Sequence, residues 1–115
     1  MKRFLLRCKI HNARVTDKCL VYEGSLTVDS LLMDAAGLVP YEMVKVYNVA
    51  NGERFDTYVI PGEAGRGDIC LNGAAARKGE GGDMVIIVSY GLFTEEEARG
   101  HEPRLVFVDD KNRIK

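Results

Sequence analysis

The sequence has no tryptophan, only three cysteines and two histidines, and a net charge of −1. So small a charge gives no long-range attraction to nucleic acid or to an anionic membrane surface. No apolar run approaches the ~18 residues that span a membrane, and charges at positions 2, 3, 7 and 9 interrupt any signal-peptide core. We therefore expect a cytoplasmic protein with no nucleic-acid or membrane partner.

Cysteine and histidine are also too scattered for a framework of disulfides or metal ligands. Cys8, Cys19 and Cys70 are odd in number and lack CxxC spacing, which argues against a disulfide framework and against a zinc cage. We expect reduced, packed cysteines. His11 and His101 have no second ligand at metal spacing, so we expect no metal site.

The 115 residues, of which 46 % are apolar and 29 % charged, suffice for one compact domain and are too few for two of usual size. The pattern predicts six or more short strands, two or three brief helical turns and no internal repeat. No long helix is available to cross over between parallel strands. The fold class expected is therefore mainly β, a small β-barrel with short helices.

Several elements have clear local signals. Apolar residues alternate with polar ones over residues 4–11, which predicts a strand with Lys9 and His11 on its polar face. Two β-rich runs flank Asn51-Gly52, which predicts a hairpin. A short helix should begin after Asp29 or Ser30 and stop at Gly37, and helical turns are expected from Asn72 to Arg77 and from Thr94. The same signals predict a turn at Gly24-Ser25 and a frayed tail over residues 109–115.

Familiar catalytic motifs are missing. The glycines of "PGEAGRG" do not lie in the strand, loop and helix order of a phosphate loop, and no serine lies in a GxSxG motif. What remains is a set of polar side chains on strands, with Arg54, Asp56 and Tyr58 on one face of the second hairpin strand. The residues alone thus indicate a small β protein with an anion-binding face.

Seven blocks, in order along about 100 residues, resemble the pyruvoyl-dependent aspartate 1-decarboxylase family. They are "KIHNARVT" at 9–16, "YEGS" at 22–25, "DAAG" at 34–37, "VYNVANGERFDTY" at 46–58, "LNGAAA" at 71–76, "GDMVIIVSY" at 82–90 and "EEAR" at 96–99. The resemblance implies decarboxylation of L-aspartate to β-alanine and CO2 for pantothenate and coenzyme A biosynthesis. It also implies a double-psi β-barrel and a homotetramer of processed chains (α4β4).

Members of this family are made as proenzymes that cleave themselves. The resemblance implies that residues 1–115 form one domain, cut into a β chain, 1–24, and an α chain, 25–115. Ser25 would attack the carbonyl of Gly24 and become a covalent pyruvoyl group, with Thr57 polarising that carbonyl. Glycine has no Cβ, so its carbonyl can lie open to attack. The need for a maturation factor is left open.

The resemblance also implies roles in turnover. The pyruvoyl ketone would form a Schiff base with the amino group of aspartate and act as an electron sink, and Tyr58 would donate the proton. The implied substrate-binding residues are Lys9, Arg54, Thr57, Asn72, Gly73, Ala74 and Ala75, and the supporting residues are His11, Tyr22 and Tyr47. Tyr47 departs from the tryptophan that family members often carry.

One point of geometry conflicts with this assignment. In a regular strand Thr57 points away from Arg54 and Tyr58, so all three can serve one site only if the strand is bulged or the pocket is shared between subunits. The alternative to the enzyme is a non-enzymatic β-barrel, a binding or assembly module in which Gly24-Ser25 is an ordinary turn.

Overall fold

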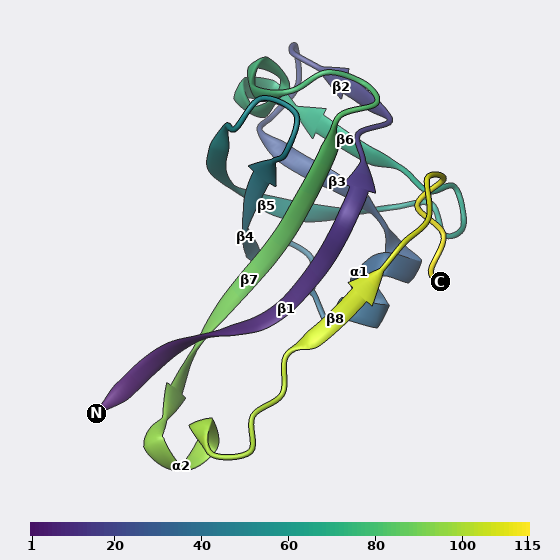
Figure 1. Ribbon diagram of the computed structural model, residues 1–115. Coiled ribbons are helices and arrows are strands. Elements are labelled where there is room, and N and C mark those ends of the chain that lie inside the picture. The colour runs from purple at the N-terminus through teal and green to yellow at the C-terminus, as the bar shows by residue number, and fades with distance from the viewer.

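The computed structural model describes residues 1–115, and its strands form one sheet in the order β2-β6-β3-β5-β4-β7-β1-β8 (Figure 1). The strands are β1 (Lys2–Arg14), β2 (Asp17–Cys19), β3 (Ser25–Asp29), β4 (Met43–Asn48), β5 (Arg54–Gly62), β6 (Ile69–Asn72), β7 (Met84–Thr94) and β8 (Arg104–Phe107), and the helices are α1 (Ser30–Ala36), the 3₁₀ helix η1 (Gly73–Lys78) and α2 (Glu95–Ala98). The mainly β class with short helices is confirmed. The double-psi barrel stays a prediction.

The core lies where the inward-facing side chains of the sheet meet. Strand alternation brings apolar side chains from most of the strands to this face, and the fully buried members include Ile10, Leu26, Val46, Val59 and Ile87. These five come from β1, β3, β4, β5 and β7. The sheet therefore owes its packing to contacts between strands that are distant in sequence.

Strand β1 is longer than expected and pairs with β7 to form an arm that extends from the body (Figure 1). Cys8 and Ile10 are buried where the arm joins the body, whereas Phe4, near its tip, is 76 % exposed. The pairing register shifts between Leu6 and Cys8 and again between Ile10 and Ala13. The simple alternation predicted for residues 4–11 is thus interrupted by bulges.

The strongest local predictions are confirmed. β4 and β5 form an antiparallel hairpin around Asn51-Gly52, and Gly52 has a φ of 78°, the left-handed region that glycine adopts without strain. Helix α1 begins after Asp29 and ends at Gly37, whose φ is 74°. Thr94 and Glu97 form a capping box at α2.

Two predictions are wrong because their partners lie far along the chain. Ser25, placed in a turn by its local signal, begins β3, which lies between β5 and β6 in the sheet. The tail is not frayed: Asn112 is only 2 % exposed. Its side-chain amide donates to the carbonyls of Arg14 and Gly67 and accepts from the backbone N–H of Arg14. These bonds hold the tail against β1.

Asp29 connects helix α1 to the glycine-rich loop. Its buried carboxylate accepts hydrogen bonds from the backbone N–H groups of Leu31, Gly65 and Gly67, at 2.8, 3.1 and 2.7 Å. Burial by itself would raise the pKa of this carboxyl, but the three donors outweigh it and the pKa lies below its ordinary value. The folded state therefore favours the ionised form.

Asp29→Asn is expected to lower the free energy of unfolding at neutral pH by about 1 to 2 kcal/mol, because the amide NH2 would face a backbone donor. Because the folded pKa is depressed, this stabilisation is present above the pKa of the unfolded chain and is lost as pH falls through the folded pKa. Urea unfolding should show that the difference in free energy of unfolding between the unaltered chain and the variant is smaller at acid pH than at neutral pH. Asp34→Asn, at an exposed position of the same helix, is the control. An equal loss of unfolding free energy in Asp29→Asn and Asp34→Asn would contradict the stabilising role of the Asp29 carboxylate.

The cysteines only partly match their prediction. All three are free, but Cys8 is buried, Cys70 is partly buried and Cys19 is exposed. The expectation of packing is therefore wrong for Cys19, which lies on the short outer strand β2. No helix has the length and apolar character needed to cross a membrane.

Candidate active site

Three neighbouring strands bring Ser25, Tyr58 and Asn72 to one face of the sheet. Ser25 pairs with Asn72 across β3 and β6. Leu26 pairs with Val59 across the parallel strands β3 and β5, so Ser25, one residue earlier, neighbours Tyr58. Because Leu26 and Val59 both point into the core, strand alternation turns the three polar residues to the opposite face.

The hydroxyl of Ser25 is buried and held in place. Ser25 is 1 % exposed and Asn72 is 3 % exposed. The Nδ2 of Asn72 donates to Ser25 Oγ and to Thr27 Oγ1, each at 2.9 Å. A buried serine with an amide donor at its oxygen has a restricted geometry, which suits a nucleophile that reacts with one nearby atom.

Gly24, by contrast, lies at the surface. A Cβ added at Gly24 would meet no atom within 4 Å, so the peptide bond joins an open residue to a buried one. Gly73 packs against it: a Cβ at Gly73 would lie 2.9 Å from the Gly24 Cα and from the Tyr22 carbonyl oxygen. The close approach and the φ of +64° both require glycine at position 73.

A hollow of about 300 Å³ opens beside this bond. It is lined by Gly24, Phe55, Asp56, Thr57, Tyr58, Asn72, Ala74, Ala75 and Lys78. Strand β5 pairs with β4 without a register shift from Arg54 to Tyr58, so it contains no bulge there. Thr57 and Tyr58 nevertheless both reach the hollow, because β3 begins only at Ser25 and leaves this part of β5 unpaired on that side.

Arg54 lies in a second hollow of about 350 Å³, which shares Phe55 and Asp56 with the first. Its guanidinium is 3.8 Å from the centre of the Tyr47 ring, a cation–π contact. The nearby carboxylate of Asp56 pairs instead with Lys45 Nζ, at 3.0 Å. The planar fork of Arg54 is thus held by an aromatic face and remains available to a carboxylate from outside the chain.

The family model for aspartate decarboxylase matches residues 1–115. The chain belongs to this family. It is 60 % identical to the aspartate 1-decarboxylase of Dehalococcoides mccartyi over 96 % of this chain and 89 % of that protein. It is 59 % identical to that of Syntrophus aciditrophicus, over 100 % and 99 % of the two chains, and 54 % identical to that of Listeria monocytogenes, over 99 % and 90 %. The resemblance seen in the sequence blocks is confirmed.

The structure does not bring every residue expected from the family to the hollow beside the Gly24-Ser25 bond. Lys9 pairs with Val88 on one side and with Leu105 on the other, and does not line the hollow. His11 lines a separate hollow of about 210 Å³ near the C-terminus. Its Nδ1 is buried without a hydrogen-bond partner. Within one chain, these side chains and that of Arg54 stand apart from Ser25.

Of the two supporting tyrosines that the family resemblance implies, only Tyr47 lines one of the two hollows. Tyr47 borders the Arg54 hollow, where its hydroxyl lies 3.1 Å from that of Tyr90. This hydrogen bond, together with burial, raises the pKa of Tyr90, so its phenol stays protonated. Tyr22 lies in the exposed segment that precedes Gly24, and its side chain is not part of either hollow.

Two polar neighbours of Ser25 were not predicted. The hydroxyl of Thr27 accepts a hydrogen bond from the side-chain nitrogen of Asn72, and the thiol of Cys70 donates one to the side-chain oxygen of Asn72. Each lies two residues from Ser25 or Asn72 in a strand and so shares that residue's face. This period of two could have identified them, had residues 25–29 been predicted as a strand.

Proposed function

We propose that this chain is a proenzyme that cleaves itself between Gly24 and Ser25 and then decarboxylates L-aspartate to β-alanine and CO2, a step of pantothenate biosynthesis. Membership of the aspartate decarboxylase family supports the reaction. The observation that carries the self-cleavage is the buried hydroxyl of Ser25, hydrogen-bonded to Asn72, next to the exposed Gly24. The products are residues 1–24 and residues 25–115.

Cleavage uses atoms that the chain already holds. Ser25 Oγ loses its proton and attacks the carbonyl carbon of Gly24; the C–N bond between the two residues breaks, and the Ser25 nitrogen takes a proton, which leaves an ester. Removal of the Ser25 α-proton then breaks the Cβ–Oγ bond and releases the carboxylate of Gly24. Water replaces the nitrogen of the resulting dehydroalanine and ammonia leaves, so residue 25 becomes a pyruvoyl group.

The surroundings of Ser25 fit such a group. The hollow of about 300 Å³ borders the site on the side of Gly24, and the small residues Ala74 and Ala75 form one wall. The ketone supplies the electron sink that decarboxylation of an amino acid requires. Thr57 lines the hollow and is placed to polarise the Gly24 carbonyl during cleavage.

Tyr58 is the proposed proton donor. It lies beside Ser25 on the same face of the sheet and lines the hollow next to Gly24. Its ring lies near that of Tyr41, with centroids 6.3 Å apart. A phenol can donate a proton to a carbanion-like centre.

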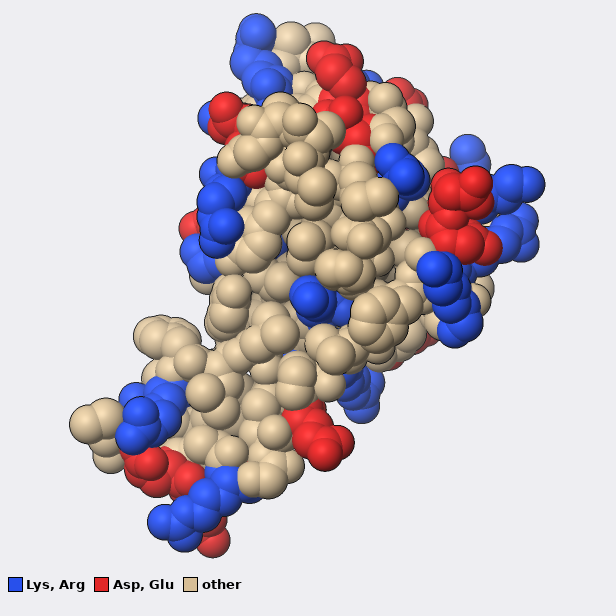
Figure 2. Space-filling view, in the orientation of Figure 1, with Lys and Arg blue, Asp and Glu red and all other residues tan.

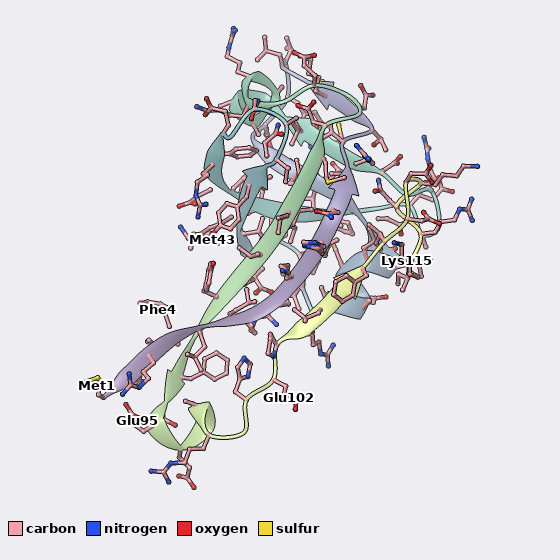
Figure 3. All side chains as sticks on the ribbon, in the orientation of Figure 1. Met1, Phe4, Met43, Glu95, Glu102 and Lys115 are labelled. Carbon is pink, nitrogen blue, oxygen red and sulfur yellow. The ribbon has the colours of Figure 1, made fainter.

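The remaining substrate contacts are proposed to come from a neighbouring copy in an α4β4 tetramer. Arg54 and Lys9 carry the positive charge suited to a carboxylate but stand apart from Ser25 of their own chain. A groove of about 550 Å³ with apolar walls lies between the arm and β4, near the exposed Phe4 and Met43 (Figure 3). Figure 2 shows a largely uncharged area on this face, with a basic side chain near its middle and most other charges toward its rim. These features suit association of copies.

The proposed location is the cytoplasm. Three free cysteines, one of them exposed, suit a reducing compartment.

The mass of the purified protein tests the proposal. We expect two fragments, residues 1–24 and residues 25–115, whose masses sum to that of the intact chain plus one water minus one ammonia. Simple hydrolysis would add the water and lose no ammonia, so the sum separates pyruvoyl formation from proteolysis. The same sample should convert L-aspartate to β-alanine. A chain that stays whole after prolonged warming, with no β-alanine formed, would instead fit the non-enzymatic alternative.

A further inference from the structure

Four polar side chains share the face of β3 and β6 that carries Ser25. Ser25 pairs with Asn72, and Thr27 pairs directly with Cys70. Ser25 and Asn72 are buried, and Thr27 and Cys70 are partly buried. Polar groups in such a place must satisfy one another, so the orientation of each one depends on its neighbours.

The amide of Asn72 is the centre of this group. Its nitrogen donates to Ser25 Oγ and Thr27 Oγ1, each at 2.9 Å, so both amide hydrogens are used. Its oxygen accepts from Cys70 Sγ at 3.2 Å. The two hydroxyls can donate or accept and would be satisfied by either end of the amide. Only the thiol of Cys70, which donates to the amide oxygen, fixes which end of the Asn72 amide faces Ser25.

Cys70 holds its proton. Burial raises the pKa of the Cys70 thiol, and the nearby Asp17, Cys19 and Asp68 raise it further. The thiol is therefore an S–H donor, rather than a thiolate, in the neutral pH range. A thiolate at this place would instead repel the amide oxygen and attract the NH2 group away from Ser25.

We propose that Cys70 is a positioning residue for self-cleavage, whose S–H holds the Asn72 amide with its hydrogens directed at Ser25 Oγ. The inference rests on the proposed function and assigns to it a residue that does not touch the reacting bond. With an N–H donor at Oγ, negative charge that develops there is stabilised when the Cβ–Oγ bond breaks and the oxygen leaves with Gly24. The reversed amide would present an oxygen to Oγ and lose this stabilisation.

The test compares cleavage rates, followed by intact mass from freshly made protein, for Cys70→Ala and Cys70→Ser. The alanine variant should cleave roughly 2- to 10-fold more slowly, the effect of one neutral hydrogen bond. Serine keeps an O–H donor and should restore most of the rate. Cys19→Ala is the matched control, because the Cys19 thiol donates to the Val21 carbonyl rather than to Asn72, and it should cleave as the unaltered chain does.

A double-mutant cycle tests whether Cys70 acts through Asn72. Asn72→Ala should slow cleavage, and adding Cys70→Ala to it should cause no further loss. Equal slowing by alanine and serine at position 70, additive losses in the cycle, or an Asn72→Ala chain that cleaves normally would each overturn the inference. So would a Cys70→Ala chain that cleaves at the normal rate. If the unaltered chain stays whole, the proposed function itself fails, and the inference with it.

Discussion

Ser25→Ala is expected to leave the chain whole and to abolish β-alanine formation. Alanine lacks the Oγ that attacks Gly24 and cannot yield a ketone, so both cleavage and the electron sink are lost. The loss should be complete rather than partial, because no other residue follows the Gly24 carbonyl and can form a pyruvoyl group there. Intact mass and an assay of β-alanine from L-aspartate give the two readouts.

The control for this variant is Ser89→Ala. Ser89 is also buried, 4 % exposed, but its hydroxyl donates to the Glu42 carboxylate on another part of the sheet. The Ser89 variant should still cleave, which separates loss of the nucleophile from general damage to the core. Residual β-alanine production by Ser25→Ala would remove the pyruvoyl group from the mechanism.

For Tyr58→Phe we expect normal cleavage followed by slow turnover. Phenylalanine keeps the ring and its packing near Tyr41 but removes the hydroxyl that donates the proton. General acid catalysis commonly contributes ~10²- to 10⁴-fold, so kcat should fall by that order while the fragment masses stay unchanged. Steady-state formation of β-alanine by the fully cleaved protein is the measurement.

Tyr41→Phe provides the matched comparison. It makes the same change in the ring that lies 6.3 Å from Tyr58, but Tyr41 is 76 % exposed and does not line the hollow. This variant should turn over at the normal rate. An unchanged kcat for Tyr58→Phe would exclude the phenol as the proton donor, and slow cleavage would indicate a role before turnover.

Local signals were sufficient where a structure depends on residues close in sequence. The hairpin at Asn51-Gly52, the helix between Asp29 and Gly37 and the capping box at Thr94 each rest on contacts within a few residues. Such contacts form in almost any tertiary setting. The shared face of Arg54, Asp56 and Tyr58 on β5 was also predicted from local sequence. Strand alternation is a property of the backbone and needs no distant contact.

The site itself was only partly predictable. Family blocks named Ser25, Tyr58 and Asn72, yet the local signal predicted a turn at Gly24-Ser25 and no strand over residues 25–29, and so Thr27 and Cys70 were missed. The hydrogen bond that joins Asn72 to Ser25 spans 47 positions of the chain, and Asn112 reaches Arg14 across 98. No local pattern specifies such a pairing, because it depends on which strands pack together.

By itself, the sequence determined the family, the β-rich class and the turns and caps, all of which depend on motifs or on neighbouring residues. Only the tertiary structure decided that Ser25 begins a strand in the middle of the sheet. It also decided that Gly24 stays open beside Gly73, and that Arg54 lies in a different hollow from the one beside Gly24. The physical reason is that burial and pairing register depend on contacts between strands that are distant in sequence. This site lies where three such strands meet, with β3 paired to both β5 and β6.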